Sequence, residues 1–469
     1  MSAARLVVWN DEDCRRVHEA TLHVLAETGI DVRYEPALEV FAAAGARVDH
    51  GRVRFDAAVV DKALASAPRS WAVRSRGRGE VIELRNGNTY FGTGSDCLYY
   101  RDPDSGERRR VQTADIEAMA ALCEQLANID FVMSMGLPED APLAVDDLSA
   151  VRAMLAGTRK PLMVAPRNGY VVKAIKDMCA AAGAADSFMI YAMPAPPLMH
   201  DKDGLTKLHA CAEHEVPVIW APAPNAGSTG PRSIAATAVV GNAETLAGLV
   251  YHQHVRPGAP FVYGTGVGAM DMRTAVDAYT TPESPLGQAA EEDLCRWYGL
   301  PSFNYAGMSD SKTLDEQWAL EYGLTVMMGG LGRGTLLHDV GYLESGLQSS
   351  CESIVFGDAA VGYARAFMKD VPTDDEALAL DEIAQVGPGG NHLARKYTRR
   401  HLRDFWYDEL FDHTVYDRWV AQPEERRTML GRVKARVAEL RSTRAFSLDA
   451  DTQAEIELIM NAAGKDRAE

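Results

Sequence analysis

Residues 160–183 read KPLMVAPRNGYVVKAIKDMCAAAG, and residues 187–200 read SFMIYAMPAPPLMH. In the first segment a short apolar run, PLMV, is followed by a loop rich in proline and glycine and then by a stretch with helical spacing. The second segment starts the same cycle again with the apolar run FMIYAM. A short buried strand that alternates with a helix is typical of a parallel sheet covered by helices.

The cycle recurs along the chain, and none of its apolar runs alternates strictly with polar residues, as expected for strands buried on both faces. The other expected strands lie in FVMSMGL (131–137), VPVIWAP (216–222), PFVYGTG (260–266), PSFNYAG (301–307), GTLLHDVG (334–341) and, as a last candidate, DEIAQVGPGGN (381–391). Eight strand–helix units fit a closed (β/α)8 TIM barrel. A doubly wound open sheet is the alternative, but neither GxGxxG after the first strand nor GxxxxGK[ST] is present.

The chain divides into three expected parts. Residues 1–130 mix helices with short strands and form an N-terminal α+β extension, and residues 131–390 form the barrel. Residues 391–469 form a helical C-terminal extension rich in arginine and aromatic residues. We expect this tail to pack across the barrel or against another subunit, so a homo-oligomer is possible.

Composition excludes several classes of protein. The net charge of −18 argues against a nucleic-acid binder, which needs a basic surface. No apolar run approaches 18 uncharged residues, so we expect no membrane span. The N-terminus meets acidic residues early and lacks a secretory apolar region, which favours a cytoplasmic location. The seven cysteines contain no CxxC pair, so we expect neither a disulfide scaffold nor an intrinsic metal site.

The expected carboxyl ends of the strands, where (β/α)8 enzymes hold their chemistry, carry few charged groups. His338 and Asp339 end an apolar strand and precede the glycine-rich segment GYLESG, which contains Glu344. The chain has no serine nucleophile elbow, no HExxH motif and no lysine placed for a Schiff base. Such a pocket suits a reaction that depends on positioning more than on proton transfer.

Six segments together resemble the trimethylamine methyltransferase family, in the right order and over nearly the whole chain. They are VLAETGIDV (24–32), FAAAGARVD (41–49), GTGSD (92–96), NYAGMSDSK (304–312), GYLESGLQSS (341–350) and VGPGGNHLARKYTRRH (386–401). The resemblance implies a (β/α)8 barrel that moves a methyl group from an amine to the cobalt(I) of a separate corrinoid protein. It implies that the cobalamin arrives on this partner and is not bound by the chain itself, which has no DxHxxG motif.

One departure from the family changes the expected substrate. Archaeal members carry pyrrolysine near the segment that matches HDVGYLESG, whereas this chain has only standard residues. The resemblance to members without pyrrolysine implies a quaternary amine such as glycine betaine, carnitine or proline betaine. A quaternary nitrogen leaves as a neutral tertiary amine, so no general acid is needed and we expect no residue in a catalytic role.

A quaternary cation attracts aromatic faces and carboxylates. We expect these groups from Asp96 and Glu344 and from aromatic residues at loop or strand ends: Tyr90, Phe91, Trp220, Tyr263 and Tyr305, with Asn304 beside them. His338 and the backbone amides of residues 387–390 are the expected donors for a betaine carboxylate, and Asp339 would fix the histidine tautomer. Packing in the core is the alternative role for His338 and for each aromatic residue.

Two other functions stay open. The methyl acceptor could be tetrahydrofolate, which would remove the need for a corrinoid partner. The chain could also be a quaternary-amine binding protein that kept the barrel without catalysis. Turnover with a reduced corrinoid would separate these alternatives.

Overall fold

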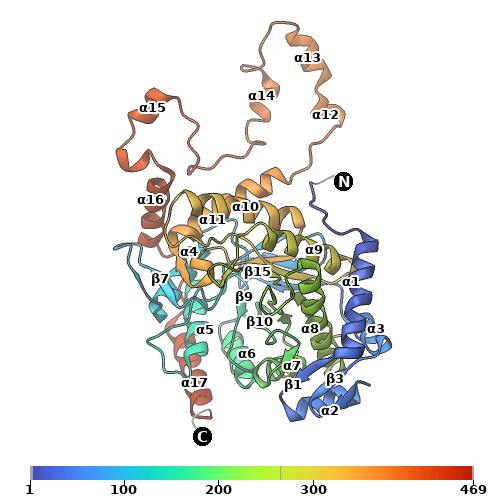
Figure 1. The fold of residues 1–469 in the computed structure, drawn as a ribbon. Coiled ribbons are helices and arrows are strands. Elements are labelled where there is room, and N and C mark those ends of the chain that lie inside the picture. Colours follow the sequence, from blue (N-terminus) through green and yellow to red (C-terminus); the bar gives the residue numbers. More distant parts are fainter. Residues whose placement is uncertain (1–3, 265, 467–469) are drawn as a thin grey trace.

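The computed structural model describes residues 4–264 and 266–466, and a seven-stranded parallel sheet lies at its centre (Figure 1). The strand order is β6-β18-β17-β14-β12-β10-β9, and each neighbouring pair is parallel. The strands are β6 (Tyr90–Phe91), β9 (Leu162–Val164), β10 (Phe188–Ala192), β12 (Val218–Trp220), β14 (Phe261–Gly264), β17 (Ser302–Tyr305) and β18 (Leu336–His338). The α/β class expected from the sequence is confirmed.

The two outer strands of this sheet share a neighbour. Phe131 forms a parallel bridge with Gly92, which directly follows β6, and Val132 forms one with Leu162 in β9. Residues 131–132 therefore lie beside both ends of the strand order.

One expected strand is wrong. Residues 381–391 do not form a strand, because α13 (Leu380–Val386) and an exposed glycine-rich turn occupy this segment. Acidic residues in the first turn and Gly387 at the end, with φ of +65°, favour a helix there. The strand next to β18 is instead β6, whose two residues stand among polar neighbours and give a weak apolar signal.

Eight helices cover the outer face of the sheet: α4 (Thr113–Glu124), α5 (Asp146–Gly157), α6 (Val172–Ala181), α7 (Lys202–His214), α8 (Ile234–Val255), α9 (Glu283–Tyr298), α10 (Glu316–Gly332) and α11 (Cys351–Phe367). Successive helices contact each other, and α11 contacts α4. Within the described residues, only α8 is long and apolar enough to cross a membrane by length and composition. Because 72% of its most apolar stretch is buried inside the protein, α8 equally fits the description of a core helix.

Alternate side chains of the strands fill the inner core. This cluster contains Phe131, Met133, Met163, Met189, Ile219, Val262, Phe303 and Leu336. The hairpin of β4 (Trp71–Arg74) and β5 (Val81–Leu84) adds Val73 and Ile82 to the same cluster. Hydrogen bonds from Arg74 N to Asp186 O, 3.0 Å, and from Arg76 N to Arg159 O, 2.7 Å, hold the hairpin beside the segments that lead into β10 and β9. The hairpin therefore covers the amino ends of the strands.

Two small sheets follow the opposite, carboxyl ends of the strands. One joins β19 (Tyr342–Leu343), β20 (Gln348–Ser350), β7 (Tyr99–Arg101) and β8 (Arg108–Arg110). The other joins β13 (Asn225–Ala226), β15 (Gly268–Asp271) and β16 (Val276–Ala278). They surround an opening that we call the mouth of the sheet.

The N-terminal segment packs against the outside of α8. It contains α1 (Asp11–His23), the π-helix η1 (Val24–Thr28), α2 (Glu35–Ala43) and α3 (Ala57–Ser66). Its strands β1 (Ile30–Val32), β2 (Arg47–Asp49) and β3 (Arg52–Arg54) form a four-stranded sheet with β11 (Met199–His200). Phe41 of α2 packs against Tyr251 of α8, with ring centroids 5.2 Å apart.

The C-terminal region divides into packed and projecting parts. The packed helices are α16 (Met429–Ser442), which contacts α4 and α11, and α17 (Ala450–Asp466), which contacts α5 and α6. Residues 370–428, which we call the arm, form two lobes that project from the body (Figure 1), and between the lobes Trp406 and Phe411 pack on Tyr363 of α11. The arm contains α12 (Asp375–Leu378), α13, α14 (Lys396–Arg400), α15 (Tyr416–Val420) and the 3-10 turn η4 (Glu424–Arg426).

Candidate functional site

Three rings form the floor of the mouth. His338 is the last residue of β18, and its ring stacks on Phe303 of β17 with centroids 4.1 Å and planes 11° apart. The ring of Tyr191, from β10, lies 5.3 Å from Phe303 and 6.2 Å from His338. Because strand side chains alternate, Tyr191 and His338 point to the same side as the core residues Met189 and Leu336 and form the layer above them.

Asp339 contacts the Nδ1 edge of the His338 ring. Its Oδ1 lies 2.5 Å from Nδ1 of His338, and its side chain is almost fully buried. The backbone of Asp339 is left-handed, with φ of +79°, where the strand breaks away toward Gly341. The two atoms lie in close contact without hydrogen-bond geometry, and Nε2 is the histidine nitrogen available to a ligand. The His338 side chain keeps 15% of its surface exposed.

A cavity of about 250 Å³ adjoins Tyr191 at the mouth. Its lining includes Asp96, Ser134, Pro166, Met193 and Lys207. Asp96 is exposed to this cavity although protein surrounds it on most sides. That crowding raises the pKa of its carboxyl, while the hydroxyl of Ser95, 2.9 Å away, opposes the rise.

Lys207 reaches the same cavity from α7. Its ammonium is buried and donates to the carbonyl of Pro166 at 3.2 Å. Burial lowers the pKa of Lys207, and the carboxylate of Asp96 acts in the opposite direction. The cavity thus presents a carboxylate and an ammonium close enough to influence each other.

A second aromatic pair lies at the carboxyl end of β17. Tyr279 stacks on Tyr305, with centroids 5.7 Å and planes 20° apart. Burial raises the pKa of Tyr279, and the carboxylates of Asp277 and Asp339 add to the rise.

Several residues expected at the site face the helices instead. Two of them contact α8: Trp220 through Glu244, and Tyr263 through Asn242. Phe91 contacts Arg365 of α11, and Asn304 contacts Glu292 of α9. They occupy the strand positions whose side chains point outward. The structure therefore does not bring these four to the mouth, which corrects the expected geometry.

Three more expected groups lie apart from the cavity. Tyr90 points inward at the closed end, where its hydroxyl accepts a hydrogen bond from Glu83 N at 3.1 Å. Glu344, in the 3-10 turn η3 (Glu344–Gly346), forms a two-pronged ion pair with Arg108, with distances of 2.7 and 2.8 Å. Its carboxylate is therefore already neutralised. The amides of residues 387–390 lie in the arm.

Tyr191, Lys207 and Tyr279 were not predicted as site residues from the sequence. Tyr191 follows Met189 by two residues in one apolar strand, so alternation from a core residue could have indicated it. Lys207 lies within a helix, and Tyr279 follows the strand β16 in a segment without a strong pattern, so neither position was marked in advance.

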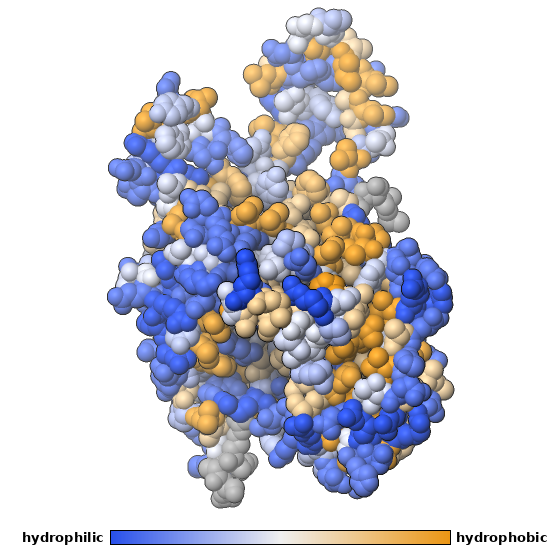
Figure 2. Space-filling view, in the orientation of Figure 1, coloured by the Kyte–Doolittle hydropathy of each residue, from blue (hydrophilic) through white to orange (hydrophobic). Residues whose placement is uncertain are grey.

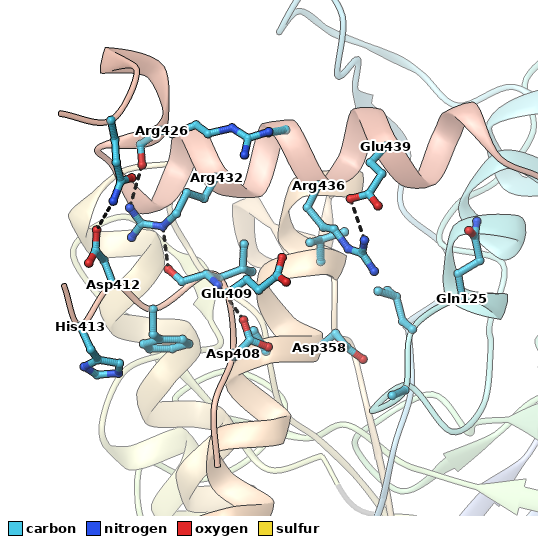
Figure 3. Close-up of a pocket in the computed structure, with 18 of the residues that line it drawn as sticks. Gln125, Asp358, Asp408, Glu409, Asp412, His413, Arg426, Arg432, Arg436 and Glu439 are labelled. Atoms are coloured by element: carbon cyan, nitrogen blue, oxygen red, sulfur yellow. Dashed lines mark hydrogen bonds and ion pairs between the residues drawn. The ribbon is translucent and has the colours of Figure 1, made fainter. Parts of the chain in front are cut away.

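Another cavity lies outside the mouth, between α11, α16 and residues 408–414 (Figure 3). Among its charged side chains, Arg436 pairs with Glu439 at 2.7 Å, and Arg432 Nε donates to Leu410 O at 3.0 Å. This cavity lies beside α11 and α16, away from the mouth, and we do not assign it to the candidate site. Across residues 4–264 and 266–466 no group of three or more His, Cys, Asp or Glu side chains is placed to hold a metal ion.

Comparisons with known proteins agree with these observations. The family model described as trimethylamine methyltransferase matches residues 2–462. A glycine betaine methyltransferase of Desulfitobacterium hafniense is 33% identical over 432 residues, with 89% of each chain covered. A trimethylamine methyltransferase of Methanosarcina barkeri is 27% identical over 99% of this chain and 97% of its own. The monomethylamine methyltransferase structure from Methanosarcina barkeri has the same fold, with a TM-score of 0.57 at 11% identity, and the match covers 99% of this chain and 88% of that one.

Proposed function

Because this chain belongs to the trimethylamine methyltransferase family, we propose that it removes a methyl group from a carboxylate-bearing quaternary amine and passes it to the corrinoid of a separate protein. Methyltransferase activity is common to the named relatives. The relative with 33% identity is named for glycine betaine, and this supports a substrate of the betaine class.

We infer that the sheet closes into the (β/α)8 barrel of this proposal. Two observations support closure: residues 131–132 bridge to both outer strands, and α11 contacts α4 to complete the sequence of neighbouring helices. A closed barrel directs the carboxyl ends of its strands toward one mouth.

The cationic end of the substrate is assigned to the aromatic side of the cavity. A quaternary ammonium has no N–H to donate, so it is held by ring faces and by nearby negative charge. Tyr191 supplies a ring, and Asp96 supplies a carboxylate in the same cavity. The Tyr279–Tyr305 pair does not line this cavity and adds a second aromatic pair at the carboxyl end of β17.

The acidic end of the substrate is assigned to Lys207, with Nε2 of His338 as a second donor. In glycine betaine one carbon separates the ammonium from the carboxylate, so a matching site needs opposite charges close together. Asp96 and Lys207 meet this requirement, because both side chains line the same cavity of about 250 Å³. This complementary pair is the observation that carries the proposal.

The residues of the mouth would act by binding and orientation. The departing group is a neutral tertiary amine, so the protein need not donate a proton to it. The docked corrinoid supplies the nucleophile that accepts the methyl group. Tyr191 and Lys207 would fix the two ends of the substrate, so that one N-methyl group points out of the mouth and water is excluded from the reacting carbon.

Calorimetric titration with glycine betaine, tetramethylammonium and trimethylamine tests this assignment. We expect glycine betaine to bind best and Asp96→Asn to weaken its binding. Methyl transfer to a reduced corrinoid protein should follow binding. Preference for trimethylamine would contradict the substrate class. Binding without transfer would favour a binding protein, and transfer to tetrahydrofolate alone would replace the corrinoid partner.

A further inference from the structure

Two residues of the candidate site have a left-handed backbone. Asp96, which lines the cavity, has φ of +66°, and Asp339, whose carboxylate contacts the His338 ring, has φ of +79°. This conformation is unfavourable for a residue other than glycine, and it persists only where the surrounding structure holds it. Contacts from elsewhere in the fold must therefore hold both residues in place.

Tyr342 connects the two segments that carry these residues. It is the first residue of β19, three positions after Asp339, and only 6% of its surface is exposed. Its N–H donates to the carbonyl of Asp339 at 3.1 Å and closes the turn after β18. Its hydroxyl donates to the carbonyl of Ser95, the residue before Asp96, in the loop 92–96 that follows β6. One buried tyrosine therefore joins the turn to the loop.

The turn and the loop also pack directly on each other at Gly94. A Cβ atom at this position would lie 2.5 Å from Oδ1 of Asp339 and closer still to Cζ of Tyr342. Only glycine leaves room for such an approach, so the tyrosine ring and the Asp339 carboxylate both lie against the loop backbone. A hydrogen bond from Val340 N to Gly92 O, 3.1 Å, adds to this contact.

A second buried tyrosine supports the turn from α10. The hydroxyl of Tyr322 donates to the carbonyl of Tyr342 at 3.0 Å and accepts from the N–H of Gly341 at 2.9 Å. Tyr322 is fully buried, so both bonds form away from water, where an unpartnered polar group is costly. The carbonyl of Tyr342 also accepts from Ser309 N at 3.2 Å, so one bond remains there without the Tyr322 hydroxyl.

We propose that Tyr342 is a positioning residue, which holds the turn after β18 against the loop 92–96. It thereby fixes the separation between His338 and Asp96. This inference rests on the proposed function, in which these two side chains meet opposite ends of a betaine. Glycine betaine is short, so a change in this separation loses the contact at one end or the other.

Calorimetric titration of the full chain and its Tyr342→Phe variant tests this role. Phenylalanine keeps the buried ring and removes the hydroxyl that bonds to Ser95. We expect the affinity for glycine betaine to fall about 10-fold and that for tetramethylammonium to change less than about 2-fold, because the loop can adjust to a ligand that has no carboxylate. Tyr322→Phe should cause a smaller loss in the same direction, since the bond from Ser309 N remains. Equal losses for the two ligands would overturn the proposal.

Tyr298→Phe is the matched control. Tyr298 of α9 is also buried, and its hydroxyl bonds to Asn242 Nδ2 of α8 and to His18 Nδ1 of α1, each at 2.9 Å. This variant should lower the melting temperature and leave both affinities unchanged. A Tyr342→Phe variant that behaves in the same way would have a structural role alone, which contradicts the proposal.

Tyr416→Phe is a surface control. Tyr416 lies in α15 of the arm, whose lobes stand away from the body (Figure 2), and 71% of its surface is exposed. Its loss of a hydroxyl should change neither the melting temperature nor the two affinities. A change in either affinity here would mean that removal of any tyrosine hydroxyl affects binding, which would overturn the assignment to Tyr342.

A double-mutant cycle links Tyr342 to the histidine. If Tyr342 acts by placing the His338 ring, the loss of glycine betaine affinity caused by Tyr342→Phe should shrink in the His338→Ala background. Additive losses would show that the two residues act independently and would overturn the proposal.

Hydrogen exchange of the ligand-free chain separates this proposal from the proposed function. Tyr342→Phe should speed exchange of the amides in residues 92–97 and 339–343, and Tyr298→Phe should not. If the wild type binds neither ligand, the proposed function fails, and faster exchange in these two segments still supports the positioning role. Unchanged exchange in both segments would overturn that role even where glycine betaine binds.

Discussion

The imidazole of His338 lies flat against the ring of Phe303, with centroids 4.1 Å and planes 11° apart. Stacking fixes the plane of the histidine ring, and Asp339 Oδ1 lies 2.5 Å from Nδ1, close enough to limit movement of that edge although the two atoms lack hydrogen-bond geometry. A histidine held in this way presents Nε2 in one direction without further loss of side-chain entropy on binding. This arrangement suits a ligand-binding donor.

We therefore predict that His338→Ala weakens binding of glycine betaine by about 1–3 kcal/mol, the value of a lost charge-assisted hydrogen bond. His338→Gln, which keeps a donor, should recover part of the loss. The methyl-transfer rate at saturating substrate should fall less than the affinity, because the contact is present in both ground and transition states. Titration and single-turnover kinetics provide the two measurements.

Glu344→Gln is the control for this series. Glu344 is paired with Arg108, so its loss should affect the turn at residues 344–346 and leave substrate affinity unchanged. A saturated rate that collapses in His338→Ala while affinity persists would place the histidine in the chemical step. A variant that changes only thermal stability would assign His338 to the core.

Lys207 should determine preference for a carboxylate. Replacement by methionine keeps the length of the side chain and removes the charge, so we expect affinity for glycine betaine to fall about 10-fold to 100-fold. Tetramethylammonium has no carboxylate, so its affinity should stay the same or rise as the opposing positive charge is lost. Calorimetric titration with both ligands measures the difference between the two affinity changes.

Lys202→Met is the matched control, because Lys202 lies on the same helix with its ammonium over Tyr170. Lys202→Met should leave the affinities for both ligands unchanged. If Lys207→Met lowers the affinities for glycine betaine and tetramethylammonium equally, the lysine supports the cavity and does not bind the substrate carboxylate.

Tyr191 should act through its ring. Tyr191→Phe keeps the aromatic face and should bind tetramethylammonium nearly as well as the wild type. Tyr191→Leu removes the face and should cost about 0.5–2 kcal/mol. Fluorescence or calorimetric titration compares the two. Equal affinities for the phenylalanine and leucine variants would rule out a cation–π contact at this position.

The alternation of strand side chains explains which parts of this molecule the sequence predicted. Six strands were recognisable because each has an apolar run of ordinary length, whereas β6 has two residues. Trp220 and Tyr263 stand at strand ends, but their register turns them toward α8. Register depends on which residue begins the inward set, and fully apolar strands do not reveal it.

The same limit applies to the candidate site. His338 and Asp339 were recognisable because a polar pair interrupts an apolar strand before glycine. Lys207 was not, because its helix offers no reason to single out one of its two lysines until the fold places it beside the same cavity as Asp96. The assignment of these residues to a substrate stays a prediction that the variants above test.

Glu244 should give the protein a pH-dependent stability that is independent of substrate. It is buried in α8 and accepts a hydrogen bond from Leu198 N at 2.6 Å. Burial raises the pKa of its carboxyl from 4.5 to about 8. Between these values the folded protein holds a proton that the unfolded chain has released. The contribution of Glu244 to the free energy of unfolding is therefore fully present below pH 4.5 and is lost as pH rises through 8, by at most about 1.4 kcal/mol per pH unit.

Glu244→Gln keeps an oxygen for Leu198 and cannot ionise, so it should lack this slope. Urea unfolding at pH 5.5, 7.0 and 8.5 gives the free energy of unfolding of both proteins. We expect the variant to gain stability relative to the wild type as pH rises, because groups that titrate in both proteins cancel in the difference. Glu213→Gln, at an exposed position on α7, should show no such trend. A difference that stays constant over this range would mean that Glu244 is ionised in the folded protein, in which case its burial must be compensated by a partner or by water.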